Sequence, residues 1–94
     1  MYYLYILYSP TEGKFYVGST SDVMKRISYH NTGRSPYTKS KALWYLVYTE
    51  EYETRKEAIV REREIKKWKS SKRIIKEFNI NLNNIGSSGP VRTG

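Results

Sequence analysis

The pattern of apolar and polar positions along the chain predicts three strands. Residues 2–8 form an unbroken aromatic and aliphatic run, YYLYILY, which predicts a strand covered on both faces. A short segment containing a proline and a glycine separates this run from a second apolar stretch at 15–17, so we expect a hairpin. The third strand-like run, LWYLVYT, lies at 43–49 and precedes a charged and polar stretch at 50–55.

Three other segments have helical patterns. The first, at 22–31, follows the polar sequence STSD and precedes a glycine. The second, at 55–69, follows a Thr-x-x-Glu capping box, and the third, KRIIKEF at 72–78, follows a pair of serines. The resulting order β-β-α-β-α-α predicts an α+β fold, a small three-stranded antiparallel sheet flanked by helices. We expect one domain at 1–80 and a flexible C-terminal tail at 81–94, which is rich in Asn, Gly and Ser.

Length and charge narrow the class of protein. The chain has 94 residues, which is enough for one small core, and we take a monomer as the default state. Its formal charge of +8 favours polyanionic partners, nucleic acid first, although a membrane surface or simple solubility would also suit a basic protein. No apolar run is long enough to span a bilayer and the opening residues do not resemble a signal peptide. We therefore expect a cytoplasmic protein without membrane association.

The sequence also restricts the metals that the protein could use. It contains no cysteine and one histidine, which excludes sulfur-based zinc sites and disfavours a zinc site made by protein ligands alone. A metal would have to bind oxygen ligands. This points to one hard cation, Mg²⁺ or Mn²⁺, held by one or two carboxylates together with water and substrate phosphate.

Two helices carry ionisable residues on or beside their apolar faces. Glu62 lies about 40° from Ala58 on a helical wheel, at the flank of the apolar face of the second helix. His30 shares a face with apolar residues of the first helix, and Arg26 lies four residues earlier at the edge of that face. Each has an ordinary structural interpretation: an ion pair between Glu62 and Lys66 or Arg26, and a histidine that is satisfied in the core.

Basic and aromatic residues gather in two segments. A polar loop before the third strand contains Arg34, Tyr37 and Lys39, where the ring of Tyr37 could stack on a base, as could that of Tyr29. The segment 66–76 has six positive charges without an acid, and a solvated helix surface is the alternative to contact with a phosphate backbone. We predict nucleic-acid contacts for Arg34, Tyr37, Lys39, Lys66, Lys67, Lys69, Lys72 and Arg73.

The order of several of these residues resembles the GIY-YIG nuclease superfamily. Tyr5 lies in the first strand, Tyr16 opens the triplet YVG in the second, and Arg26, His30 and Glu62 follow in the order of that superfamily. The chain is most similar to small stand-alone bacterial members of the UPF0213 type. It also resembles the N-terminal nuclease domain of the bacterial excision-repair nuclease, the excinuclease. The similarity covers residues 2 to 78.

The resemblance implies a Mg²⁺-dependent endonuclease that hydrolyses nucleic-acid phosphodiesters, DNA in preference to RNA. It implies that Glu62 holds the metal and Arg26 contacts a phosphate oxygen. Tyr5, Tyr16 or His30 could be the general base, and the sequence leaves this choice open. The chain departs from the superfamily pattern in two places: the leading glycine is absent, and Ser19 stands where the excinuclease has a lysine.

Two other functions remain open at this stage. A catalytically weak or inactive nucleic-acid-binding module would explain the missing lysine and the lack of a separate DNA-targeting domain. A basic protein-interaction domain would explain the charge alone.

Overall fold

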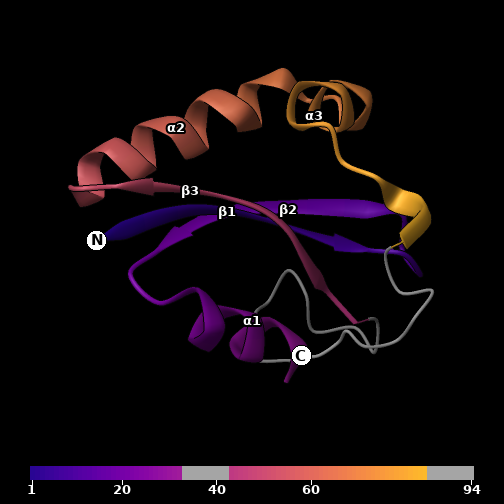
Figure 1. Ribbon diagram of the computed structural model, residues 1–94, viewed down its shortest axis with the longest axis horizontal. Helices are drawn as coiled ribbons and strands as arrows, with labels where there is room; N and C mark the ends of the chain where they lie inside the picture. The colour runs from indigo at the N-terminus through magenta and orange to yellow at the C-terminus, as the bar shows by residue number, and fades with distance from the viewer. Residues whose placement is uncertain (33–42, 85–94) are drawn as a thin grey trace.

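The computed structural model describes residues 1–32 and 43–84 as a small sheet with helices on both sides (Figure 1). The strands are β1 (Tyr2–Ser9), β2 (Lys14–Thr20) and β3 (Tyr45–Tyr52), and β1 lies in the middle of the order β2-β1-β3. Both pairings of β1 are antiparallel. The predicted α+β fold with its three-stranded antiparallel sheet is therefore confirmed.

Each of the three α-helices is capped by the side chain of the residue just before it. The helices are α1 (Val23–Asn31), α2 (Arg55–Trp68) and α3 (Ser71–Phe78), and the 3₁₀ helix η1 (Leu82–Asn84) follows. The N-caps of α1, α2 and α3 are respectively Asp22, Thr54 and Ser70, and Thr54 forms a complete capping box with Glu57. Capping satisfies backbone amides that the first helical turn leaves without partners. The polar residues before each of these helices thus set where it starts.

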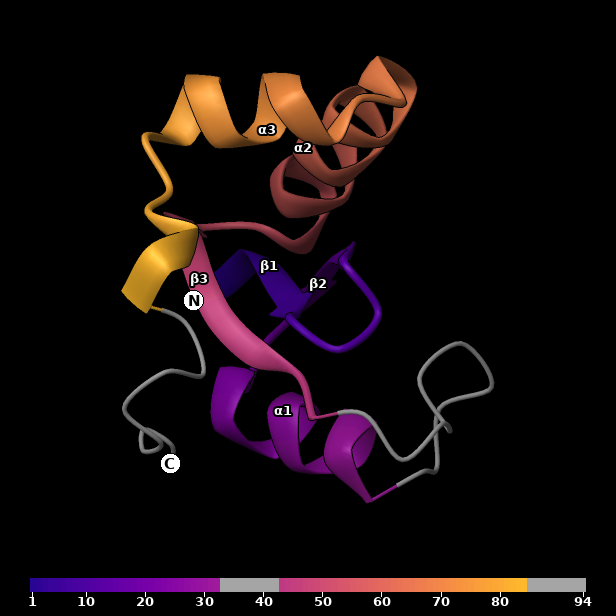
Figure 2. The same cartoon turned by 90° about the vertical axis from the view of Figure 1, so that its right-hand side faces the viewer.

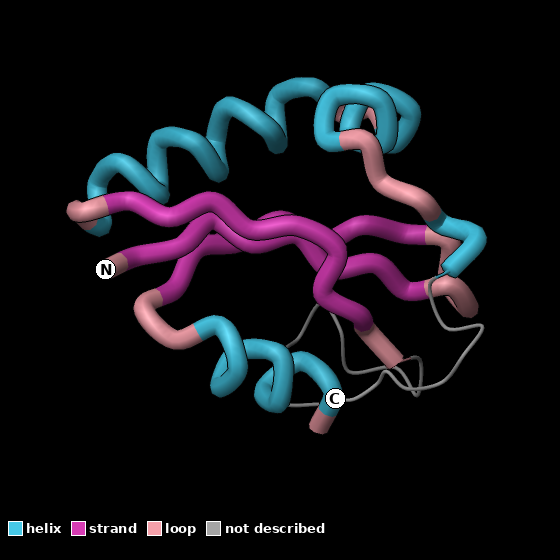
Figure 3. Tube along the Cα trace, viewed as in Figure 1, coloured by secondary structure: helices cyan, strands magenta, loops and turns pink. Residues whose placement is uncertain are grey.

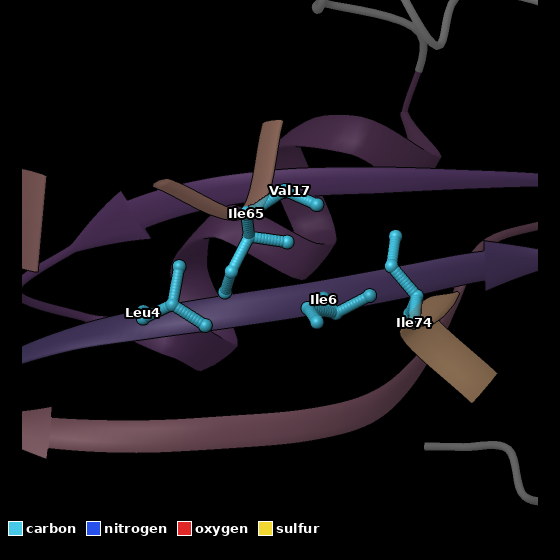
Figure 4. Close-up of a cluster of buried hydrophobic side chains, with 5 residues drawn as sticks. All are labelled: Leu4, Ile6, Val17, Ile65 and Ile74. Carbon is cyan, nitrogen blue, oxygen red and sulfur yellow. The ribbon is translucent and has the colours of Figure 1, made fainter. Parts of the chain in front are cut away.

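The sheet separates two apolar layers, and Figures 2 and 3 show from different sides the helices that cover its two faces. Helices α2 and α3 cover one face, where Leu4 and Ile6 of β1 pack with Val17, Ile65 and Ile74 (Figure 4). Helix α1 lies on the opposite face, where a second cluster contains Tyr5, Leu7 and Trp44. Because successive residues of a strand point to opposite faces, an unbroken apolar run such as YYLYILY is what a strand buried on both sides requires.

Two strands have limits that differ from the predicted ones. β2 extends beyond the predicted 15–17, because its polar end pairs with β1 through backbone hydrogen bonds that need no apolar side chain. β3 begins at Tyr45, two residues after the predicted start, and continues through Glu50 and Glu51 into the stretch predicted to follow it. The structure describes the predicted tail only to residue 84, so its flexibility stays a prediction.

A polar cluster explains how the carboxylate of Glu50 is tolerated in the second half of β3. Glu50 accepts hydrogen bonds from Arg61 of α2 at 2.9 and 3.1 Å, and from the hydroxyls of Tyr48 and Tyr52 at 2.6 and 2.7 Å. Burial by itself raises the pKa of Glu50, but these hydrogen bonds outweigh it and lower that pKa. The Arg61 guanidinium also lies over the ring of Phe78, so this cluster joins β3, α2 and α3.

Candidate active site at the edge strand β2

The centre of the candidate site is a buried tyrosine–histidine pair. Tyr5 lies in the middle of β1 on the face that carries α1, and His30 lies in the last turn of α1. The Tyr5 hydroxyl and His30 Nε2 are 3.0 Å apart and hydrogen-bonded, and both residues are only 1% exposed. The helical spacing that placed His30 on the apolar face of its helix therefore brings it directly to Tyr5.

Gly18 makes room for the ring of Tyr5. The two residues face each other in the β1–β2 register. A Cβ atom at position 18 would lie 2.5 Å from the Tyr5 hydroxyl oxygen and 2.6 Å from Cζ, well inside van der Waals contact. Only glycine lets the Tyr5 ring lie across β2, which explains why the triplet YVG ends in glycine at this position.

Burial keeps both members of the pair uncharged at neutral pH. Burial, and then the positive charge of Arg26, lower the pKa of His30 from 6.5 to about 4. Burial also raises the pKa of Tyr5 well above its usual value; Tyr16 and Glu62 add to this rise, and Arg26 opposes it. Near pH 7 the site therefore contains a neutral imidazole next to a protonated phenol.

Two more tyrosines and an arginine surround this pair. The Tyr16 ring lies 4.4 Å from the His30 ring and 6.2 Å from the Tyr5 ring, measured between centroids. The Tyr29 ring contacts His30 edge-on at 5.6 Å, and the Arg26 guanidinium lies over Tyr29 at 5.1 Å. Tyr16 is half-buried and Arg26 is exposed, so these two face solvent where Tyr5 does not.

Glu62 approaches the same strand from the opposite side of the sheet. Its Oε1 accepts a hydrogen bond from the Ser19 hydroxyl at 2.8 Å, and its Oε2 lies 2.6 Å from Lys66 Nζ. The expected i,i+4 ion pair with Lys66 is thus present, and the bond to Ser19 adds an anchor on β2. Because Glu62 also acts on the pKa of Tyr5, its charge belongs to the same electrostatic environment. Tyr5, Tyr16, Arg26 and His30 therefore lie on the α1 side of the sheet. Glu62 lies on the other side and is linked to β2 through Ser19.

The oxygen donors at this point could hold a hard cation. Glu62 offers a carboxylate whose side chain is 19% exposed, and the Ser19 hydroxyl lies beside it. Nowhere in the described residues do three or more histidine, cysteine, aspartate or glutamate side chains form a group that could hold a metal. A single carboxylate suits Mg²⁺, which commonly keeps several waters and takes further oxygens from a substrate phosphate.

The predicted basic surface is divided by the fold. A groove of about 530 Å³ at the start of β2 is lined by Lys66 and Lys69, together with Lys14 and Tyr16. Arg73 instead lies over the Trp68 ring at 4.3 Å. The three remaining lysines of segment 66–76 are exposed and do not line the groove: Lys67, Lys72 and Lys76. Three further predicted residues lie outside the described part of the chain: Arg34, Tyr37 and Lys39.

Sequence reasoning missed the role of Ser19 and of a second pocket. Ser19 was noted only as a position without lysine, yet it is two residues after Val17 and therefore faces α2, as the alternation of a strand requires. The second pocket, at the other end of β2, is lined by Lys25 and Arg55 among others. No sequence signal joins those two residues, because they come from different helices.

Comparisons with known proteins identify the family of this chain. The GIY-YIG catalytic domain family matches residues 1–76. The chain belongs to the GIY-YIG family. UPF0213 proteins of Staphylococcus aureus strains Mu3 and Mu50 are each 44% identical to it over 70 residues, covering 71% of this chain and 85% of theirs. A UPF0213 protein of Bacillus halodurans, solved by solution NMR, is 32% identical with a TM-score of 0.47, covering 97% of this chain and 90% of that one.

Membership of the GIY-YIG family identifies a nuclease domain whose substrate is nucleic acid. The name of the UPF0213 relatives says nothing about activity or metal. Within the residues that the structure describes, no helix is long and apolar enough to cross a membrane. The substrate form, the metal and the roles of individual residues are left to be argued from the site.

Proposed function

We propose that the protein is a Mg²⁺- or Mn²⁺-dependent endonuclease that hydrolyses nucleic-acid phosphodiesters at the edge of β2. The observation that supports this best is the convergence of five residues on one strand: Tyr5, Tyr16, Arg26 and His30 on one side, and Glu62 on the other. Hydrolysis of a phosphodiester requires an activated water and positive charge near the phosphoryl oxygens. The charged groups and the solvent-facing tyrosine are suited to these tasks.

The two tyrosines have different roles in this proposal. Tyr5 is buried and keeps its proton, so it orients its partner and does not take a proton from water. Its hydroxyl is hydrogen-bonded to Nε2 of His30, whose low pKa keeps the imidazole neutral at pH 7, and in the tautomer protonated at Nδ1 this Nε2 accepts the hydroxyl hydrogen. Tyr16 packs against His30 and is half-exposed, so we assign it as the general base. Arg26 presents a fork of donors to a phosphate oxygen.

Glu62 is the proposed ligand for the metal. Its carboxylate fits a hard cation, provided that the exposed Lys66 side chain turns away from Oε2. When bound, Mg²⁺ would draw negative charge from the scissile phosphate. Ser19 holds Oε1 in place and thereby fixes the direction in which the carboxylate points along β2.

Cleavage of labelled DNA and RNA, as single strands, duplexes and branched junctions, tests the proposal. We expect cleavage with Mg²⁺ or Mn²⁺ and none in EDTA, and a loss of at least about 100-fold for Glu62→Gln. Glu64→Gln, on the same helix and exposed, is the matched control and should keep its activity. Metal-independent cleavage, or equal activity of the two variants, would contradict the proposal.

The assignment of the general base has its own test. Tyr16→Phe should lower kcat by about 10²- to 10⁴-fold, the usual range for loss of a general base. Tyr5→Phe should lower kcat less and should destabilise the fold, because it removes the buried hydrogen bond between Tyr5 and His30. A larger kcat loss for Tyr5→Phe than for Tyr16→Phe would transfer the role to Tyr5.

One observation favours a second function, binding without cleavage. Both carboxylate oxygens of Glu62 already have partners within the protein, Ser19 and Lys66. An inactive binding module would show salt-dependent binding to nucleic acid with no cleavage under any metal condition. A protein-interaction domain, in contrast, would bind neither DNA nor RNA at low salt.

Two finer points of the assignment, a preference for DNA over RNA and a place in DNA repair, rest on the resemblance to the GIY-YIG nucleases. A third, the cytoplasmic location, rests on the sequence pattern alone. The cleavage panel decides the first of these directly, and a repair assay on a deletion strain decides the second. Fractionation with an antibody against the chain would test the third.

A further inference from the structure

A second cavity lies next to the candidate site, at the end of β2. Its volume is about 570 Å³, within the range of pockets that bind ligands. Most of its lining residues come from the end of β2, from α1 and from the first turns of α2, three parts of the chain that lie at the same end of the sheet in Figure 1. Six of its lining residues carry the argument: Tyr2, Ser19, Lys25, Arg26, Tyr29 and Arg55. Two of these, Ser19 and Arg26, also belong to the site, so the cavity opens directly beside it.

The lining of this cavity carries a net positive charge, which favours an anionic ligand. It contains three cations, Lys25, Arg26 and Arg55, and one acid, Asp22. The Asp22 side chain already accepts the Lys25 backbone amide as the cap of α1. Among the described residues, the ion pairs involve none of the three cations. A ligand with phosphate groups would supply the missing negative charge.

The position of the cavity indicates a polymer and not a single small anion. The cavity lies at the end of β2, the groove with Lys14, Lys66 and Lys69 lies at its start, and the candidate site lies between them. The seven residues of β2 span about 23 Å at the usual rise of a strand. Each strand of B-form DNA carries one phosphate per about 3.4 Å of helix axis, and the phosphates of an extended single strand lie further apart, so β2 is long enough to face several phosphates of one strand.

We propose that this cavity binds the sugar–phosphate backbone on one side of the scissile bond, with Lys25 and Arg55 neutralising phosphates and Tyr29 offering a stacking surface for a base. The proposal rests on the proposed function in taking a nucleic-acid strand as the ligand. The strand then runs along β2, from this cavity across Tyr16 to the groove at Lys66 and Lys69.

Binding without cleavage tests this proposal. The probe is a fluorescein-labelled DNA strand of about 12 nucleotides, within the usual range of single-strand site sizes, titrated with the full chain in EDTA over a series of salt concentrations. The Lys25→Gln/Arg55→Gln variant removes two cavity charges, and Lys56→Gln/Arg63→Gln removes two exposed charges of α2 outside both pockets. All four side chains are exposed, so both variants should keep the wild-type melting temperature.

We expect the cavity variant to reduce the slope of log K against log salt by about 1.4, which is about 0.7 for each lost phosphate contact of a single strand. The control variant should change the slope by less than half of that. Equal slopes for the two variants would overturn the proposal while leaving the nuclease assignment intact. Absence of any binding by the wild-type protein would also overturn the proposed path of the strand, while the cleavage panel with metal would still decide the nuclease assignment.

A second arm distinguishes a polymer from a small phosphate ligand. A 5′-mononucleotide and inorganic phosphate serve as competitors of the labelled strand. We expect both to compete only weakly, and equally weakly against wild type and cavity variant. A mononucleotide that displaces the strand from the wild-type protein at micromolar concentration, and not from the variant, would show a small-molecule site and overturn the proposed path of the strand.

Discussion

Replacing Gly18 with alanine tests whether the Tyr5 ring lies across β2 as described. The added Cβ would lie 2.5 Å from the Tyr5 hydroxyl oxygen, 2.6 Å from Cζ and 2.9 Å from Cε1. Ordinary contact between carbon atoms is about 3.5–4.0 Å, so the ring would have to retreat by about 1 Å. The ring is buried and hydrogen-bonded to His30, and a retreat of this size breaks the 3.0 Å hydrogen bond.

The expected loss of stability for Gly18→Ala is about 2 kcal/mol. Overpacking of a core typically costs about 1–3 kcal/mol, and the lost hydrogen bond to His30 adds about 1 kcal/mol. Alanine in a strand offsets this by about 0.5–1 kcal/mol, because glycine loses more backbone entropy on folding. The steric effect is the larger, so the variant should be destabilised. Urea unfolding followed by circular dichroism measures the difference.

A double-mutant cycle separates the clash from other effects of the alanine. In a Tyr5→Leu background the Cβ at position 18 no longer meets an aromatic ring, so Gly18→Ala should be neutral or slightly stabilising. The coupling free energy should be about 2 kcal/mol. Gly13→Ala is the control, since Gly13 has a φ of +65° and no atom near its Cβ, and its cost should be the same in both backgrounds. Equal costs of Gly18→Ala in both backgrounds would refute the described contact.

Two further predictions concern the free energy of unfolding and two ionisable residues, His30 and Glu50. The unfolded chain binds a proton at His30 near pH 6.5 and the folded chain only near pH 4, so the free energy of unfolding should fall by about 3 kcal/mol as the pH drops from about 6.5 to 4. In His30→Gln this part of the pH dependence should vanish, and an unchanged profile in urea titrations would contradict the low pKa. Glu50→Gln should destabilise the fold by about 2 kcal/mol, because it weakens the hydrogen bonds with Arg61. The exposed Glu51→Gln serves as its control, and equal losses in thermal melts would show that the Glu50 cluster does not stabilise the fold.

Local chemistry made much of this protein predictable from its sequence. The strands and helices follow from apolar periodicity, and the caps Asp22, Thr54 and Ser70 mark the helix starts. The order of Tyr5, Tyr16, Arg26, His30 and Glu62 was enough to predict the family, and the match to the GIY-YIG catalytic domain confirmed it. These features depend on neighbours within a few residues or on the linear order of side chains, both of which a sequence contains.

Only the tertiary structure decided how those residues meet. The register between β1 and β2 sets Tyr5 opposite Gly18, and burial between sheet and α1 makes the Tyr5–His30 pair neutral. The packing of α2 on the sheet joins Glu62 to Ser19, which lies 43 residues away in the chain. Strand register, burial and the pKa values that follow from it are properties of long-range packing, and no local pattern in the sequence encodes them one by one.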